Sequence, residues 1–251
     1  MDNTNYNQDV FTLPHDVVPL PTKGLFYKQK KESFKVGYLT AEDENILMSP
    51  NASKEGIIFS LLRNKIYEPG FDINHLLDVD VQAILVFLRN TSFGPEYTFR
   101  VNDPVTSKMF EVTVNIDEIN YIKPTHQPNN EGYFIFKLPK SDKEVKCKLL
   151  TLGDQRELDK LKDSYPANFT IPIITKRLEK QIIELDGNDN RGEIVKFVQQ
   201  MPIADSKFIR NYLAECEPKL DLDRTITAPS GEKVTISVAF GAEFFRPFFW
   251  L

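Results

Sequence analysis

The spacing of hydrophobic residues changes along the chain and predicts an alternation of strands and helices. Residues 34–40 (FKVGYLT) alternate apolar and polar side chains, which is the period of a strand with one buried face. Residues 57–66 and 72–93 instead carry apolar side chains three and four positions apart, as on one face of a helix. Gly94 and Pro95 end the second of these helices. The first part therefore reads as a strand followed by helices.

Strand-like alternation returns after Pro95. Residues 97–101 and 110–114 flank a turn at residues 102–104, which predicts a β-hairpin. Near the end of the chain the pattern is similar, because a turn at residues 228–231 (APSG) precedes the alternating residues 234–238. Two helices, at residues 191–199 and residues 205–216, are predicted before this second hairpin.

This order of elements is predicted to occur twice. The Leu-Pro pair at residues 20–21 recurs at residues 138–139, each time ahead of a strand-like segment. We therefore predict an α+β fold of two related halves, each with a strand, helices and a terminal β-hairpin. The predicted divisions are an amino-terminal arm (1–18), a first half (19–121), a linker (122–132) and a second half with an aromatic tail (133–251).

Both halves also carry the same helix start. Asp43 stands three residues after Thr40, and Asp154 stands three residues after Thr151. At this spacing the two side chains can cap the free amides of a helix amino terminus, and the acidic residue suits the positive end of the helix dipole. Capping therefore explains these acidic residues without a metal.

Composition and charge limit the classes of function. The net charge is −5 and the isoelectric point about 5.4, which argues against nucleic acid or an anionic membrane surface as a partner. Cys147 and Cys216 suit a reducing compartment better than a disulfide framework. No apolar run approaches the roughly 20 residues of a membrane span, so we expect no membrane association.

The sequence does not place residues suited to catalysis near one another. His15, His75 and His126 lie in the arm, before a helix and in the linker, without a nucleophile or a second metal ligand nearby. Glycine-rich phosphate loops are also lacking. We therefore expect no enzymatic activity, no small-molecule substrate and no cofactor.

Seven segments of the chain are unusual in combination, namely LPTKGLFY, YLTAEDENIL, GIIFSLLRNKI, DINHLLDVDVQAILVFLRNTSFGPEY, LPKSDKEVKCKLLTLGDQREL, MPIADSKFIRNYL and the terminal EFFRPFFWL. Together they resemble the baseplate hub protein family of T-even-type contractile-tailed bacteriophages. The resemblance implies a structural or assembly component of the baseplate hub in the virion tail, which would be made and assembled in the host cytoplasm. It also implies contacts with other baseplate or tail proteins, in multiple copies around the hub. The alternatives are a transient tail-assembly chaperone that the virion does not retain, and a nucleic-acid-binding module.

The same resemblance bears on metal binding. Some members of the family carry CPxC knuckles at the tips of both hairpins, where paired thiolates bind zinc. In this chain the corresponding positions hold Asp103 and Thr106 in the first half, and Ala228 and Gly231 in the second. The hairpins would thus be of a degenerate zinc-knuckle type, and we expect no structural zinc.

Two aromatic segments are the predicted partner-binding sites. The first is the part of LPTKGLFY that the second half does not repeat, and the second is the carboxyl-terminal tail. Aromatic and arginine side chains often dominate the binding energy of protein interfaces. The alternative for the tail is that it folds back into the chain's own core. The predicted contact residues are Leu25, Phe26, Tyr27, Phe244, Phe245, Arg246, Phe248, Phe249 and Trp250.

Overall fold

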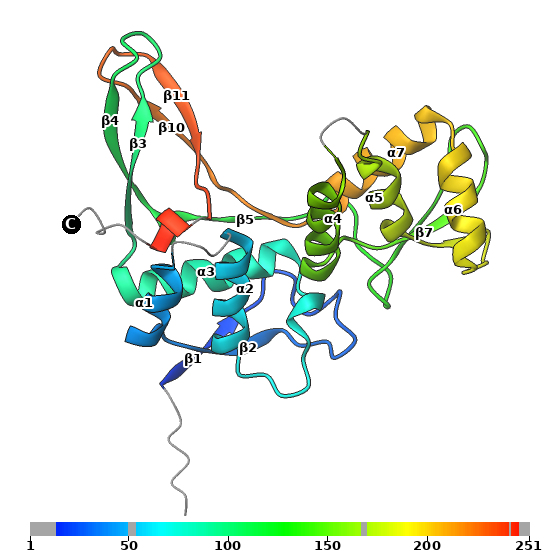
Figure 1. The fold of residues 1–251 in the computed structure, drawn as a ribbon, viewed down its shortest axis with the longest axis horizontal. Coiled ribbons are helices and arrows are strands. Elements are labelled where there is room, and N and C mark those ends of the chain that lie inside the picture. Colours follow the sequence, from blue (N-terminus) through cyan, green and yellow to red (C-terminus); the bar gives the residue numbers. More distant parts are fainter. Residues whose placement is uncertain (1–13, 50–53, 167–169, 241, 246–251) are drawn as a thin grey trace, which may run out of the picture.

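The computed structural model describes residues 14–49, 54–166, 170–240 and 242–245, and it is a mixed α+β fold with small antiparallel sheets, as predicted (Figure 1). Its helices are α1 (Ala41–Leu47), α2 (Lys54–Lys65), α3 (Asp78–Phe93), α4 (Leu152–Ser164), α5 (Ile173–Gln181), α6 (Arg191–Gln200) and α7 (Ile203–Cys216), with 3-10 turns η1 (Ile73–His75), η2 (Ile116–Glu118) and η3 (Ala242–Phe245). Its strands are β1 (His15–Pro19), β2 (Ser33–Gly37), β3 (Glu96–Asn102), β4 (Met109–Asn115), β5 (Tyr121–Ile122), β6 (Phe134–Lys137), β7 (Glu144–Cys147), β8 (Ile182–Leu185), β9 (Lys219–Leu220), β10 (Asp223–Thr227) and β11 (Lys233–Ser237).

The first lobe consists of the β1–β2 pair and helices α1, α2 and α3 (Figure 1). Along α3 the side chains of Val81, Ile84, Leu85 and Leu88 are buried, which is the spacing of one helix face. They pack in one apolar cluster with Phe34 of β2 and with residues of α2. The periodic stripe in the sequence therefore marks the face that forms this first core.

The predicted helix over residues 72–93 is wrong in its first turn and a half. Asp72 caps the short turn η1, the chain is extended at Leu76 and Leu77, and α3 begins only at Asp78. The break has a tertiary cause, because distant residues take the main-chain groups that a continuous helix would use. The N–H of Leu77 donates to the Tyr27 hydroxyl at 3.1 Å, and the carbonyl of Leu76 accepts from the N–H of Leu152 at 2.7 Å.

The second lobe consists of the β6–β7–β8 sheet and helices α4 to α7 (Figure 1). Its core is a separate apolar cluster that includes Val145, Ile182 and Leu213. Leu77 and Val79 at the start of α3 also belong to it, whereas later residues of α3 belong to the first core. One helix thus contributes to both cores and joins the lobes.

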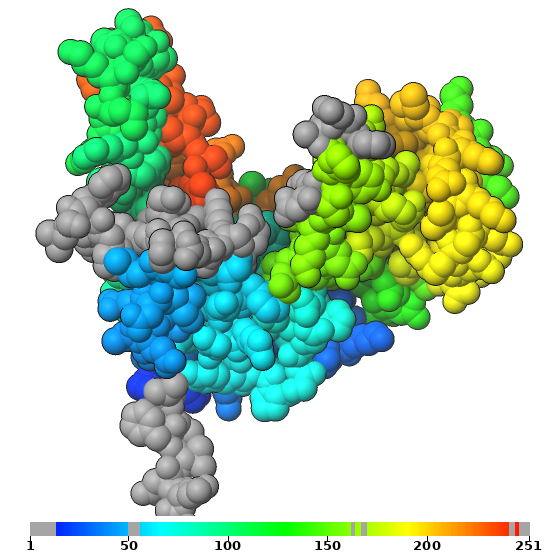
Figure 2. All heavy atoms as spheres, in the orientation of Figure 1, coloured from blue at the N-terminus to red at the C-terminus, as the bar shows by residue number. Residues whose placement is uncertain are grey.

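Both predicted hairpins are present and together form a projecting arm. β3 pairs with β4 and β10 pairs with β11, both antiparallel, and the two hairpins lie side by side above the first lobe (Figures 1 and 2). On the outer face of the first hairpin Thr98 and Thr113 share a hydrogen bond of 2.7 Å, whereas Val112 faces inward and is buried. Figure 2 shows an open space between this arm and the second lobe.

The carboxyl-terminal part of the described chain returns to the first core. Ile236, Val238 and Phe244 belong to the same cluster as α3, although the lobe that precedes them in sequence has its own core. β5, which follows the first hairpin, pairs with β9, which precedes the second hairpin. Of the predicted amino-terminal arm, residues 1–13 lie outside the described residues and residues 15–18 belong to β1.

The two predicted helix starts are confirmed. The Asp43 carboxylate accepts a hydrogen bond from the N–H of Thr40 at 2.7 Å, and the Asp154 carboxylate accepts one from the N–H of Thr151 at 3.1 Å. Each pair is a capping box at the start of its helix, α1 or α4. Capping is therefore the local role of both acidic residues.

A second matched anchor involves the Leu-Pro segments. The N–H of Thr22 donates to Asp80 at 3.1 Å, and the N–H of Lys140 donates to Asp205 at 2.8 Å. Asp80 and Asp205 are the third residues of α3 and α7, and both are fully buried. Each Leu-Pro segment is thus fastened by a buried carboxylate at the start of a long helix. The order of elements is not identical, because β8 and α6 occupy the place that η1 takes in the first lobe.

Candidate functional site

The segment at residues 20–27, here called the Leu-Pro loop, is a series of tight turns. Its N–H groups donate to carbonyls three residues earlier, as from Lys23 to Leu20 at 2.9 Å and from Tyr27 to Gly24 at 3.1 Å. Gly24 has φ +69, and a Cβ there would lie 2.5 Å from the carbonyl oxygen of Lys31. Only glycine fits this position without displacing the main chain.

Asp80 is the centre of a buried polar network beneath the loop. Its carboxylate accepts hydrogen bonds from the N–H of Thr22 (3.1 Å), from the Thr22 hydroxyl (2.6 Å) and from the Tyr27 hydroxyl. Burial raises the pKa of Asp80, and the hydrogen bonds from Thr22 and Tyr27 oppose this increase without cancelling it. The network fixes the loop to α3, and the sequence reasoning did not identify it.

The three predicted contact residues of the loop have different surroundings. Tyr27 is buried in the first core, while the half-buried ring of Phe26 packs against Phe134 of the second core, with ring centroids 6.2 Å apart. Leu25 is exposed over 43% of its surface. Two of the three side chains therefore stabilise the chain itself and connect its lobes. A partner contact by this set stays a prediction, and Leu25 is the residue free to make it directly.

The aromatic tail is described as far as Phe245. Phe244 and Phe245 are buried in the first core, and the Phe244 ring contacts Tyr97 at 5.1 Å and Phe240 at 4.9 Å between centroids. Burial of these two rings corresponds to the alternative in which the tail folds back into its own core. The other predicted contact residues of the tail lie outside the described residues, namely Arg246, Phe248, Phe249 and Trp250.

The tips of the two hairpins are joined through the Asp103 carboxylate. One oxygen accepts from the N–H of Val105 (2.9 Å) and of Thr106 (3.0 Å) in its own turn. The other accepts from the N–H of Ser230 in the second hairpin at 2.9 Å. We call this arrangement the tip clamp. It links segments 127 residues apart in the sequence.

The residues at the tips do not fit a zinc ion. Ala228 and Gly231 have no ligating side-chain atom, and the Asp103 oxygens already accept hydrogen bonds from three N–H groups. The zinc-knuckle character of the hairpins, which the resemblance implied, is therefore not supported. Across the described ranges, we also find no group of three or more His, Cys, Asp and Glu residues that could hold a metal ion.

Acidification is expected to open the tip clamp. Burial raises the pKa of Asp103, but hydrogen bonds from Thr106, Val105 and Ser230 outweigh it and lower the pKa from 3.8 to about 2. Because the pKa of the Asp103 carboxyl is lower in the folded than in the unfolded state, the ionised carboxylate stabilises the folded state at pH values above the unfolded-state pKa. This stabilisation is lost as the pH falls through about 2. Hydrogen exchange of the Ser230 amide should therefore accelerate as the pH falls toward about 2, relative to other arm amides.

Two variants separate the clamp from general charge effects. In Asp103→Ala the Ser230 amide is expected to exchange fast at every pH, because its acceptor is gone. Glu232→Gln removes an exposed negative charge from the same tip and should leave the exchange unchanged. Equal protection of the Ser230 amide in wild type and Asp103→Ala would contradict the clamp.

A half-exposed aromatic cluster covers part of the second lobe. The Tyr212 ring of α7 stacks on His126 at 4.6 Å and lies 4.2 Å from Phe136 of β6, between centroids. Phe208, one turn earlier on α7, lies 5.8 Å from Phe136 and is 36% exposed. At the arm tip Val105 is also exposed, over 65% of its surface. These are apolar surfaces available to another molecule.

The sequence model of the T4 bacteriophage base plate protein family matches residues 26–246, which include the second lobe, the arm and all of the first lobe after β1 and the start of the Leu-Pro loop. The chain therefore belongs to this family, as the resemblance predicted, and it is a component of the baseplate of a bacteriophage tail. Comparison with curated proteins and with solved structures gives no significant match. None of the helices within the described ranges is long and apolar enough to span a membrane.

Proposed function

We propose that this baseplate protein is a structural or assembly component of the hub, the central part of the baseplate, and that it acts by protein–protein contacts rather than by catalysis. Membership of the base plate family is the observation that carries this proposal. The projecting arm and the exposed apolar residues on the arm and on α7 support it, because such surfaces suit docking to neighbouring subunits.

We also propose that the chain consists of two related halves. The matched capping boxes support this, as do the matched Leu-Pro anchors on Asp80 and Asp205. Buried apolar residues follow these aspartates at the same spacing, with Ile84 four residues after Asp80 and Ile209 four residues after Asp205. Each half would then contribute one hairpin to the arm.

The proposed contact surfaces are the exposed Leu25, the arm tip and the aromatic cluster on α7, together with the end of the tail. Deleting residues 248–251 is expected to abolish baseplate assembly while leaving a folded monomer, because the buried Phe244 and Phe245 are retained. Far-ultraviolet circular dichroism and thermal melting would test the fold, and complementation of a phage with a nonsense mutation in this gene would test assembly.

Substitution of residues 248–250 by serine is the matched control, since it keeps the chain length and removes only the aromatic side chains. It should fail in assembly as the deletion does. An unfolded deletion variant would instead assign the terminal aromatics to the chain's own core. Normal assembly with a folded deletion variant would remove the tail from the set of contacts.

The hub role has its own test. Nonsense mutants of this gene, grown in a host without a suppressor tRNA, are expected to accumulate heads without tails. Electron micrographs of these cultures should show no complete baseplates. Adding the purified full chain to such an extract should restore tails. Complete baseplates in the mutant extract would contradict a structural or assembly role.

A further inference from the structure

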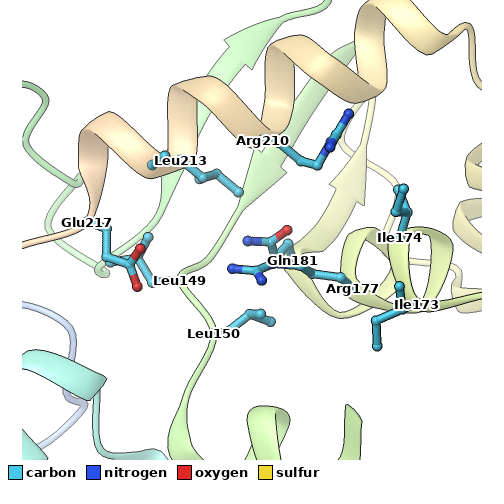
Figure 3. A pocket seen from close by; sticks show the side chains of 10 residues that line it. Leu149, Leu150, Ile173, Ile174, Arg177, Gln181, Arg210, Leu213 and Glu217 are labelled. Carbon is cyan, nitrogen blue, oxygen red and sulfur yellow. The ribbon is translucent and has the colours of Figure 1, made fainter. Parts of the chain in front are cut away.

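A hollow of about 350 Å³ opens between α5, α7 and the segment that follows β7 (Figure 3). Three buried leucines, Leu149, Leu150 and Leu213, form part of its wall. Ile174 of α5 lies on its lining and is exposed over 50% of its surface. The hollow therefore offers apolar contact to a side chain that enters it.

Gln181 in this hollow has an unused hydrogen-bond acceptor. Its side chain is 4% exposed, and the Oε1 atom is buried without a hydrogen-bond partner in the part of the protein that the structure describes. The main-chain carbonyl of the same residue is satisfied by the N–H of Lys148 at 2.8 Å. Figure 3 shows the carboxamide between Leu213 and Arg177, facing the hollow. A buried unpaired acceptor is costly, and a ligand with an N–H donor removes that cost.

Comparison with the first lobe indicates that the unpaired acceptor of Gln181 is not inherent in the fold. There the last residue of α2, Lys65, is buried and forms an ion pair with Asp43. Gln181 is the last residue of α5 and likewise precedes a residue, Ile182, that pairs with a strand. Lys65 thus has a partner, whereas the Oε1 atom of Gln181 at the corresponding place in the second lobe has none among the described residues.

Two arginines border the hollow. Among the described residues neither Arg177 nor Arg210 forms an ion pair within 4.0 Å, and the Nε of Arg210 donates only to the carbonyl of Ser206 at 3.3 Å. Glu217 lies on the opposite side (Figure 3). Burial and the neighbouring Asp78 raise the pKa of Glu217, and the charges of Lys219 and Arg177 oppose this. Arg177 is therefore partly balanced, whereas Arg210 is left for an incoming anion.

We propose that this hollow binds an extended polypeptide segment of another protein in which a large apolar side chain is adjacent to Asp or Glu. The apolar side chain packs on the leucines, a main-chain N–H donates to Gln181 Oε1, and the carboxylate pairs with Arg210. The need for an N–H donor favours a peptide over an anion that can only accept, and the arginines favour an acidic segment over a basic one. This assignment goes beyond the proposed function, and it holds wherever in the tail the protein acts.

Selection of short random peptides displayed on yeast, with the purified full chain as bait, tests this proposal. The wild type is expected to enrich peptides in which a large apolar residue neighbours Asp or Glu. The variant Arg177→Glu/Arg210→Glu changes exposed side chains and should reverse the preference toward Lys or Arg. Lys196→Glu on α6, an equally exposed charge reversal outside the hollow, should select the same peptides as the wild type.

Single substitutions in the hollow refine the test with one selected peptide. Gln181→Met keeps the volume and removes the acceptor, so the dissociation constant should rise about tenfold, as expected for one lost buried hydrogen bond. Glu217→Gln removes the competing carboxylate and should lower the dissociation constant about threefold. Selection of peptides without acidic residues, or an unchanged preference in the double arginine variant, would overturn the proposal. Thermal melting of each variant confirms that the lost binding is not lost folding.

Discussion

Replacing Phe244 with alanine is expected to lower the free energy of unfolding by about 3–5 kcal/mol. The ring is fully buried and contacts Tyr97 of β3 and Phe240, so its removal leaves a cavity where the arm meets the first core. Phe245 is buried to the same degree and should behave alike. Because single domains are stable by about 5–15 kcal/mol, the double variant should be largely unfolded at room temperature. Urea denaturation followed by circular dichroism measures each change.

Phe208→Ala is the matched control for this prediction. Its ring is 36% exposed on α7, so the same substitution should cost less than about 1.5 kcal/mol. If Phe244→Ala were as stable as Phe208→Ala, the rings near the end of the chain would not belong to the core, and both would return to the set of partner contacts.

Asp80→Ala is expected to destabilise the protein by about 2–4 kcal/mol, because it removes the common acceptor of three hydrogen bonds. The buried N–H of Thr22 and O–H of Tyr27 would both lose their acceptor, and the Tyr27 oxygen would keep only the hydrogen bond that it accepts from the N–H of Leu77. The Leu-Pro loop should then detach from α3, which would expose Tyr27. The free energy of unfolding and the protection of the Thr22 amide against hydrogen exchange measure the two effects.

Asp80→Asn separates the loss of hydrogen bonds from the loss of charge. Asparagine keeps the volume and one acceptor oxygen, and its amide can donate to the Thr22 or Tyr27 hydroxyl, so we expect a cost of about 1 kcal/mol. Unchanged protection of the Thr22 amide in Asp80→Ala would contradict the role of this carboxylate as the anchor of the loop.

Local signals in the sequence predicted local structure well. The Thr-x-x-Asp spacing at Thr40 and at Thr151 predicted two capping boxes, and the alternation around residues 102–104 and 228–231 predicted both hairpins. These features depend on side chains within a few residues of one another, so the sequence contains their causes.

Features that depend on distant residues were not predictable in the same way. The start of α3 moved to Asp78 because the Tyr27 hydroxyl and the N–H of Leu152 bind main-chain groups before it, and no local pattern records this. The tip clamp likewise needs Asp103 and Ser230 to meet across the arm. A signal for the loop anchor was present, because each Leu-Pro segment is followed later in the chain by an aspartate four residues before a buried isoleucine. These pairs are Asp80 with Ile84 and Asp205 with Ile209.

The surroundings of the aromatic residues were the feature least predictable from the sequence. Apolar side chains near a chain end have the same composition whether their own core or a partner buries them, so sequence alone left both alternatives open. In the structure Tyr27, Phe244 and Phe245 are core residues. The proposed contacts accordingly move to exposed positions such as Leu25 and Phe208 and to the hollow around Gln181.

Quantitative mass spectrometry of purified virions, compared with purified baseplates that have not yet joined a tail, tests the central claim most directly. As a structural component of the hub, this protein should be present in both samples in the same fixed ratio to the other baseplate proteins. Its presence in the free baseplates and absence from the virions would contradict that claim and identify a transient assembly chaperone instead. Its absence from both would contradict any role within the baseplate itself.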